Sequence, residues 1–95
     1  MSFETIRNYY EQLVMQRVVD TLSEQPHKKD SEYLADVVCV ALNHLPPRYM
    51  RHDVDMAFYV SPQEREEIML KVYDAVDFAV RFIAERQRPV RLLKN

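Results

Sequence analysis

The 95-residue chain contains no glycine at all. Folds with many strands and tight hairpins usually need glycine for turns that require positive φ, whereas helices joined by proline and polar turns do not. The absence of glycine therefore favours an all-α fold. It also excludes the glycine-rich loops with which many nucleotide-binding enzymes cradle phosphate.

The chain also lacks a second cysteine, a long apolar run and a large excess of charge. A single cysteine, Cys39, excludes an internal disulfide and is typical of a reducing compartment. No apolar run approaches the roughly 18 residues of a membrane helix, and no signal peptide opens the chain. The net charge of −2 disfavours nucleic acid as a partner, because non-specific binding requires a basic excess. We therefore expect a cytoplasmic protein with no membrane partner.

The length corresponds to one domain, which we place at 1–95 with a loosely ordered tail at 87–95. A first helix is predicted from Ser2, as its N-cap, to about Ser23. Its apolar face consists of residues spaced three and four apart, namely Ile6, Tyr10, Leu13, Val14, Val18 and Leu22.

The last helix has the clearest start signal in the sequence. Ser61 can cap it, Pro62 occupies its first position, and Glu64 can close a capping box with Ser61. The apolar pattern predicts that this helix ends near Arg86.

The chain is organised around residues 36–49, which read DVVCVALNHLPPRY. The first part of this stretch belongs to a second predicted helix. Asp30 or Ser31 can cap that helix, which continues to Asn43 or His44. This helix is apolar on nearly every side, which predicts that other elements surround it and that Cys39 is a core residue. Two prolines then stop it, so we expect Arg48 and Tyr49 to project from a stiff, extended corner.

Residues 51–60 follow a different pattern, in which apolar and polar side chains alternate. The alternation is typical of a strand, although an irregular loop that packs Phe58 onto the helices remains an equal alternative. A lone strand would leave backbone groups unpaired, and pairing with a second copy across a two-fold axis would satisfy them. The sequence thus predicts a three-to-four-helix domain with one short extended segment, assembled as a homodimer.

The stretch at 36–49 resembles the D-V-x-A-L-A-L-N-x-L-P-P-x-Y block of the ComFB (late competence development) family. The segment NYYEQLV at 8–14 is similar to the opening helix of that family, and the resemblance extends roughly from Arg7 to Phe82. ComFB-like proteins include receptors for cyclic dinucleotide second messengers such as cyclic di-GMP. The resemblance therefore implies a non-catalytic signalling protein that binds such a dinucleotide and acts on an unidentified downstream protein.

Metal binding and catalysis have little support in the sequence. Some ComFB-like sequences carry a cysteine cluster before the block, but the corresponding residues 27–33 here read HKKDSEY. We therefore expect no zinc and no other cofactor. Cys39 lies in mid-helix among apolar residues, where a thiol is poorly reactive, and no G-x-S-x-G or H-E-x-x-H motif is present. We do not expect an enzyme.

The candidate ligand-binding residues are Arg48, Tyr49, Arg51, Asp53 and Asp55. Arginine binds phosphate with two hydrogen bonds and stacks on flat bases. Tyrosine can stack on a purine, and a carboxylate can accept hydrogen bonds from a guanine edge. In the alternative interpretation, Arg48 pairs with Asp36 or another acidic neighbour, and Tyr49 packs in the core.

Four residues of the block are assigned a structural role: Asp36, Asn43, Pro46 and Pro47. The amide of Asn43 is expected to satisfy backbone groups at the turn that the prolines leave free. Asp36 is expected to bond to a turn or to pair with an arginine.

The function that the sequence favours is cyclic di-GMP reception. The alternative is a helical homodimer that acts only through protein–protein contacts in competence or motility regulation, without a nucleotide. DNA binding linked to competence is disfavoured by the acidic charge balance.

Overall fold

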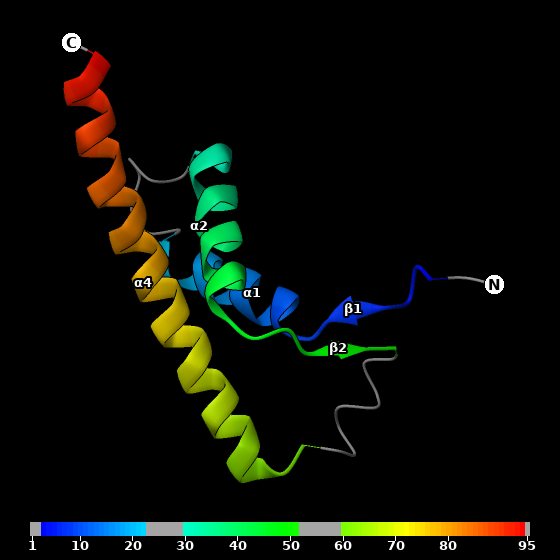
Figure 1. Ribbon diagram of the computed structural model, residues 1–95. Helices are drawn as coiled ribbons and strands as arrows, with labels where there is room; N and C mark the ends of the chain where they lie inside the picture. Colours follow the sequence, from blue (N-terminus) through cyan, green and yellow to red (C-terminus); the bar gives the residue numbers. More distant parts are fainter. Residues whose placement is uncertain (1–2, 23–29, 52–59, 95) are drawn as a thin grey trace.

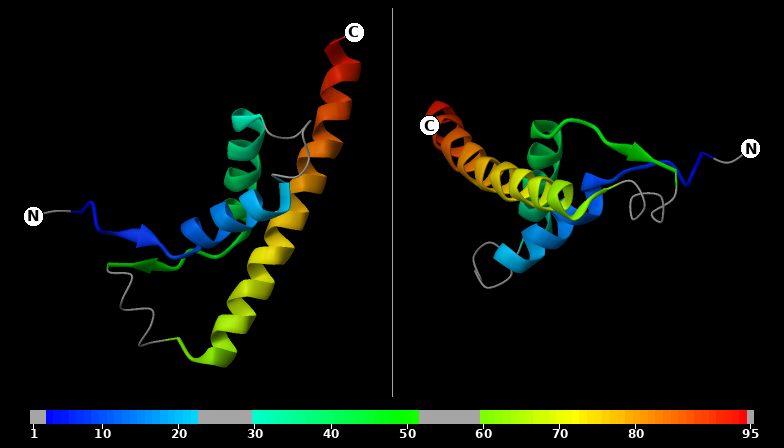
Figure 2. Two further views of the ribbon diagram at one scale, coloured as in Figure 1. Left: turned by 180° about the vertical axis from the view of Figure 1, so that it is seen from behind. Right: turned by 90° about the horizontal axis from the view of Figure 1, so that it is seen from below.

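The computed structural model describes residues 3–22, 30–51 and 60–94, with side chains up to Arg86. Its elements, in chain order, are β1 (Arg7–Asn8), α1 (Tyr10–Leu22), α2 (Ser31–His44), β2 (Tyr49–Met50) and α4 (Pro62–Lys94). Figure 1 shows α4 as a long helix against which α1 and α2 pack, while β1 and β2 extend away from the helices. The two further views in Figure 2 show the same arrangement. The predicted mostly helical fold is confirmed.

The core lies where the three helices meet. Buried side chains recur at helical spacing on α1 and α4, because each helix turns one apolar stripe toward the others. The buried residues are Tyr10, Val14, Val18, Leu22, Val37, Ala41, Leu45, Val60, Ile68, Val72, Ala75, Val76, Ala79 and Ile83. Full burial of one such larger side chain contributes roughly 1.5–3 kcal/mol, so this cluster is the main source of stability.

Helix α1 begins seven residues later than the sequence suggested, at Tyr10 rather than at Phe3, directly after Ser2. The residues before it are used differently: Arg7 and Asn8 form a strand, and Asn8 Oδ1 accepts a hydrogen bond from Tyr10 N at 3.1 Å. Ile6, which was expected on the apolar face of the helix, is 49% exposed. Pairing with a distant strand has replaced the first two predicted helical turns.

Helix α2 has the predicted ends but not the predicted surroundings. Asp30 caps it, with its side chain accepting from Glu32 N, and the helix ends at His44. Only Val37 and Ala41 are buried, while Cys39 is exposed. The prediction of a core cysteine was therefore wrong. Helices α1 and α4 cover one side of α2, and the described part of the chain supplies no element for the other side.

The two short strands form an antiparallel pair, in which Arg7 lies opposite Met50 and Asn8 lies opposite Tyr49. The extended segment after the prolines therefore has a partner within its own chain at Tyr49–Met50. Most of the predicted alternating stretch, residues 52–59, lies outside the described residues. The homodimer was expected because a strand at 51–60 would have no partner within its own chain. Strand β2 does have such a partner, β1, and does not require a second copy for pairing.

Helix α4 starts as predicted, with Ser61 Oγ accepting from Glu64 N at 3.1 Å. It continues to Lys94, beyond the predicted end at Arg86. The earlier end was predicted because the apolar pattern of the helix stops near Arg86. Pro89 lacks the N–H that would bond to the Glu85 carbonyl. The backbone nevertheless stays helical through Pro89, and a loosely ordered tail at 87–95 remains a prediction. None of the described helices combines the length and the apolar character that crossing a membrane requires.

Candidate functional site

The corner formed by residues 46–51 is fastened to the start of α1 through its backbone. Tyr9 N donates to Arg48 O at 2.7 Å, and Arg48 N donates to Asn8 Oδ1 at 3.3 Å. The same Asn8 oxygen accepts from Tyr10 N at 3.1 Å. One amide oxygen therefore caps α1 and also fixes the position of Arg48.

Asn8 is the residue of this site that the sequence interpretation missed. An asparagine just before a periodic apolar run is a standard start signal for a helix, so the pattern did contain it. The corresponding role had been given to Asn43, whose side chain is exposed and has no hydrogen bond within the described ranges. The end of α2 is closed by the backbone instead, since Leu45 N donates to Leu42 O at 3.3 Å.

The two prolines follow an extended Leu45 (φ −100°, ψ 147°), as expected for a residue that precedes proline. Pro46 and Pro47 are both exposed. Asp36 is exposed on α2, and its side chain makes no ion pair within the described ranges. The predicted partnership between Asp36 and Arg48 is therefore not formed.

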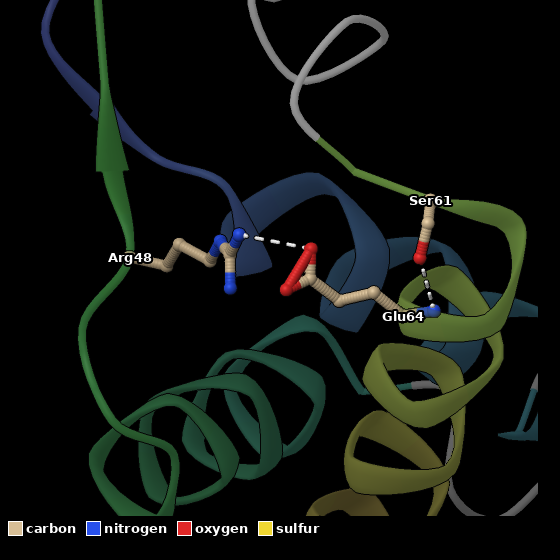
Figure 3. A network of polar contacts seen from close by, with 3 residues as sticks. All are labelled: Arg48, Ser61 and Glu64. Atoms are coloured by element: carbon tan, nitrogen blue, oxygen red, sulfur yellow. Dashed lines mark hydrogen bonds and ion pairs between the residues drawn. The ribbon is translucent and has the colours of Figure 1, made fainter.

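Arg48 instead pairs with Glu64 in the first turn of α4, as Figure 3 shows. Arg48 Nη2 lies 3.4 Å from Glu64 Oε1, and the two side chains are 36% and 38% exposed. A pair this exposed contributes no more than about 1 kcal/mol. The alternative interpretation, in which Arg48 pairs with an acidic residue, is thus correct. The partner is Glu64 and not Asp36.

Tyr10 lies near this ion pair and is only 2% exposed. Burial raises the pKa of its phenol above the ordinary value of 10.0. The positive charge of Arg48 lowers that pKa, whereas the negative charges of Glu64 and Tyr9 raise it. The phenol is therefore neutral at physiological pH.

Tyr49 is 67% exposed, so the alternative in which it packs in the core does not hold. Arg48, just before β2, directs its guanidinium toward Glu64 of α4. Arg51, directly after the strand, is exposed. The structure therefore leaves Tyr49 and Arg51 exposed and sets Arg48 on the α4 side. Asp53 and Asp55 lie outside the described residues.

The described surface includes the following hollows. The one that adjoins the corner has about 150 Å³ and is lined by Arg7, Asn8, Tyr9, Glu11, Gln12, Leu13 and Met50. An open groove of about 460 Å³ runs along α4, lined by Pro62, Arg65, Glu66, Met69, Leu70 and Tyr73. A third, of about 290 Å³, is lined by Val40, Asn43, His44, Phe78 and Phe82.

Two ring contacts shape the larger hollows. The guanidinium of Arg17 lies 4.2 Å above the Tyr73 ring, at the edge of the groove on α4. The rings of His44 and Phe78 stack at 3.9 Å with an interplanar angle of 11°. Within the described residues, no three histidine, cysteine or acidic side chains lie close enough together to hold a metal ion.

Fold and site together define a small helical domain with an exposed arginine–tyrosine corner. Residues 7–87 match the family model described as "Late competence development protein ComFB". The chain therefore belongs to the ComFB family, and the resemblance drawn from the sequence is confirmed. The matched range begins at β1 and includes Asn8, the corner and the ion pair between Arg48 and Glu64. No curated protein matches the chain.

Proposed function

We propose that the chain is a non-catalytic cytoplasmic receptor for a cyclic dinucleotide, with cyclic di-GMP as the first candidate. Membership of the ComFB family supports this proposal, because ComFB-like proteins include such receptors. The observation that carries it is the exposure of Tyr49, which is 67% exposed between Arg48 and Arg51. An exposed aromatic ring next to arginine residues in the sequence is chemically suited to a flat base linked to phosphate.

The recognition uses the exposed side chains at and after β2. Tyr49 stacks on one base, and Arg51, two residues further on, binds an adjacent phosphate. A cyclic dinucleotide is a ring that carries two phosphates. Its second phosphate extends past the edge of the strand and binds the guanidinium of Arg48. Asp53 and Asp55 remain candidates for contacts with a guanine edge.

A homodimer remains part of the proposal, on new grounds. The hollow beside the corner, at about 150 Å³, is smaller than the roughly 300 Å³ at which ligand pockets begin. A dinucleotide therefore binds on the surface or between two copies. Large exposed apolar side chains are available for pairing: Phe3, Ile6, Met15, Val19, Leu70 and Tyr73. Light scattering on purified protein measures the mass directly, and a monomer at all concentrations contradicts the homodimer.

A thermal-shift measurement with cyclic di-GMP tests the receptor proposal. A ligand at a hundred times its dissociation constant adds about 2.7 kcal/mol, which is about 11–22 °C in midpoint for a domain of this size. In Tyr49→Ala, loss of one stacked base lowers affinity by about 1–3 kcal/mol, so the shift shrinks markedly at the same ligand concentration. An unchanged midpoint in the wild type contradicts the proposal.

The alternative function is a helical dimer that works only through contacts with other proteins. The apolar groove on α4, with Leu70 61% exposed, is the observation that favours it. This alternative predicts a thermal midpoint that is indifferent to every nucleotide. In either case, an unidentified downstream protein receives the signal.

A further inference from the structure

The carboxylate of Glu64 has two possible partners at the start of α4. Pro62, Gln63 and Glu64 are the first three residues of this helix, and Ser61 caps it. In a complete capping box, the cap side chain accepts from the third N–H, and the third side chain accepts from the cap N–H. The first bond is present, from Glu64 N to Ser61 Oγ at 3.1 Å.

The second bond of the box is not formed. The Glu64 carboxylate points instead toward Arg48, as Figure 3 shows. The N–H of Ser61 has no acceptor among the residues that the structure describes. The standard capping-box position for Glu64, beside this N–H, lies within its own helical turn.

The contact that holds Glu64 at Arg48 is weak. The contact with Arg48 is 3.4 Å long, whereas a strong charge-assisted hydrogen bond measures about 2.7–2.9 Å. Both side chains are more than one-third exposed, so solvent screens the attraction. A carboxylate in the first turn of a helix is favoured by the helix dipole in either position. A stronger anion at Arg48 is therefore sufficient to shift Glu64.

The backbone of Arg48 does not have to move for this exchange. Asn8 Oδ1 and Tyr9 N hold its N–H and its carbonyl, at 3.3 Å and 2.7 Å. Only the guanidinium and the Glu64 carboxylate, both partly exposed, have to reorient. Side-chain rearrangements of this kind take place within nanoseconds at exposed sites.

We propose that a phosphate of the bound dinucleotide replaces Glu64 on Arg48, and that the released Glu64 completes the capping box by accepting from Ser61 N–H. The inference rests on the proposed function and adds its regulation. Glu64 acts as an internal competitor that lowers the affinity of the free protein for its ligand. Completion of the capping box adds a hydrogen bond to the first turn of α4. The apolar groove begins in this turn, at Pro62, so ligand binding also changes the end of the groove.

Titration calorimetry with cyclic di-GMP tests the competition. Glu64→Gln removes the charge that competes for Arg48, but glutamine can still close a capping box. The expected result is binding about two- to fivefold tighter than in the wild type, the range of an exposed ion pair. Glu67→Gln is the matched control, because it makes the same change in charge at an exposed position one turn onward. Its affinity should equal that of the wild type.

The amide NMR signal of Ser61 gives a second readout, which a purely electrostatic effect would not move. On saturation with cyclic di-GMP, the Ser61 amide proton should shift downfield and exchange more slowly in the wild type but not in Glu64→Ala. Equal affinities in Glu64→Gln and Glu67→Gln, or an unchanged Ser61 signal in the saturated wild type, overturn the exchange while leaving the receptor proposal standing. Absence of binding in every variant overturns the receptor proposal and the exchange together.

Discussion

Replacement of Asn8 by alanine should be among the most costly single changes outside the apolar core. Asn8 Oδ1 accepts from Tyr10 N and from Arg48 N, so the substitution removes the acceptor of two partly buried donors. Loss of a helix cap costs about 1 kcal/mol. A donor left without a partner in a partly buried site costs about 1 kcal/mol more, at the lower end of the usual range. We therefore expect Asn8→Ala to lose about 2 kcal/mol of unfolding free energy.

Urea denaturation measures this loss, as a shift in midpoint with an unchanged slope. In a thermal scan, the same loss corresponds to about 8–16 °C for a domain of this size. Asn8→Asp keeps a side-chain oxygen that can accept and should remain within about 0.5 kcal/mol of the wild type.

Asn43→Ala is the decisive comparison, because the sequence pattern gave the structural role to Asn43. The Asn43 side chain is exposed, so its removal should cost less than about 0.5 kcal/mol. If Asn43→Ala proved as destabilising as Asn8→Ala, the hydrogen-bond arrangement at the corner would be incorrect.

Three further predictions concern stability, pH and reactivity. Ile68→Ala should cost about 2–5 kcal/mol in urea denaturation, because Ile68 is 2% exposed, whereas Leu70→Ala, at a position 61% exposed, should cost far less. Burial raises the pKa of Tyr10 above 10.0, so the native state holds the phenolic proton more tightly than the unfolded chain. The stabilisation of the native state by this proton is complete below about pH 10 and falls as pH rises further. Urea midpoints measured up to about pH 11 should therefore decline less in Tyr10→Phe than in Tyr49→Phe. The exposed thiol of Cys39 should react with a disulfide reagent in the folded protein as fast as in urea, and strong protection in the folded state would contradict its placement.

Local pattern was sufficient to predict α2 and the start of α4. Asp30 precedes an apolar run and Ser61-Pro62 precedes another, and both signals act over three or four residues. The start of α1 was missed although Asn8 gave a local start signal, because the apolar pattern continued back to Ile6. The contact between Asn8 and Arg48, 40 positions apart, could not be predicted from that pattern. Such a contact leaves no periodic trace in the sequence.

Whether Cys39 is buried or exposed depends on how many elements pack around α2. An apolar helix predicts burial on every side only if enough elements are available to surround it. Here α1 and α4 are the helices that pack against α2, so Cys39 remains exposed although its sequence neighbours are apolar.

The candidate site was predicted as a cluster along the chain, and its geometry required the structure. Arg48 and Tyr49 are adjacent in sequence, but Arg48 pairs with Glu64 of α4 whereas Tyr49 is exposed. The sequence also suggested Asp36 as a partner for Arg48, whereas the chain path brings Glu64 there from 16 residues away. Glu64 itself had been recognised only as part of a capping box.

An amide NMR titration with cyclic di-GMP tests the central claim most directly, because it reports the backbone amides at once. The receptor account predicts that the largest changes fall at Arg48, Tyr49 and Arg51, and that they require a higher ligand concentration in Tyr49→Ala. A spectrum unchanged at millimolar ligand, or changes confined to the groove on α4, would contradict the account.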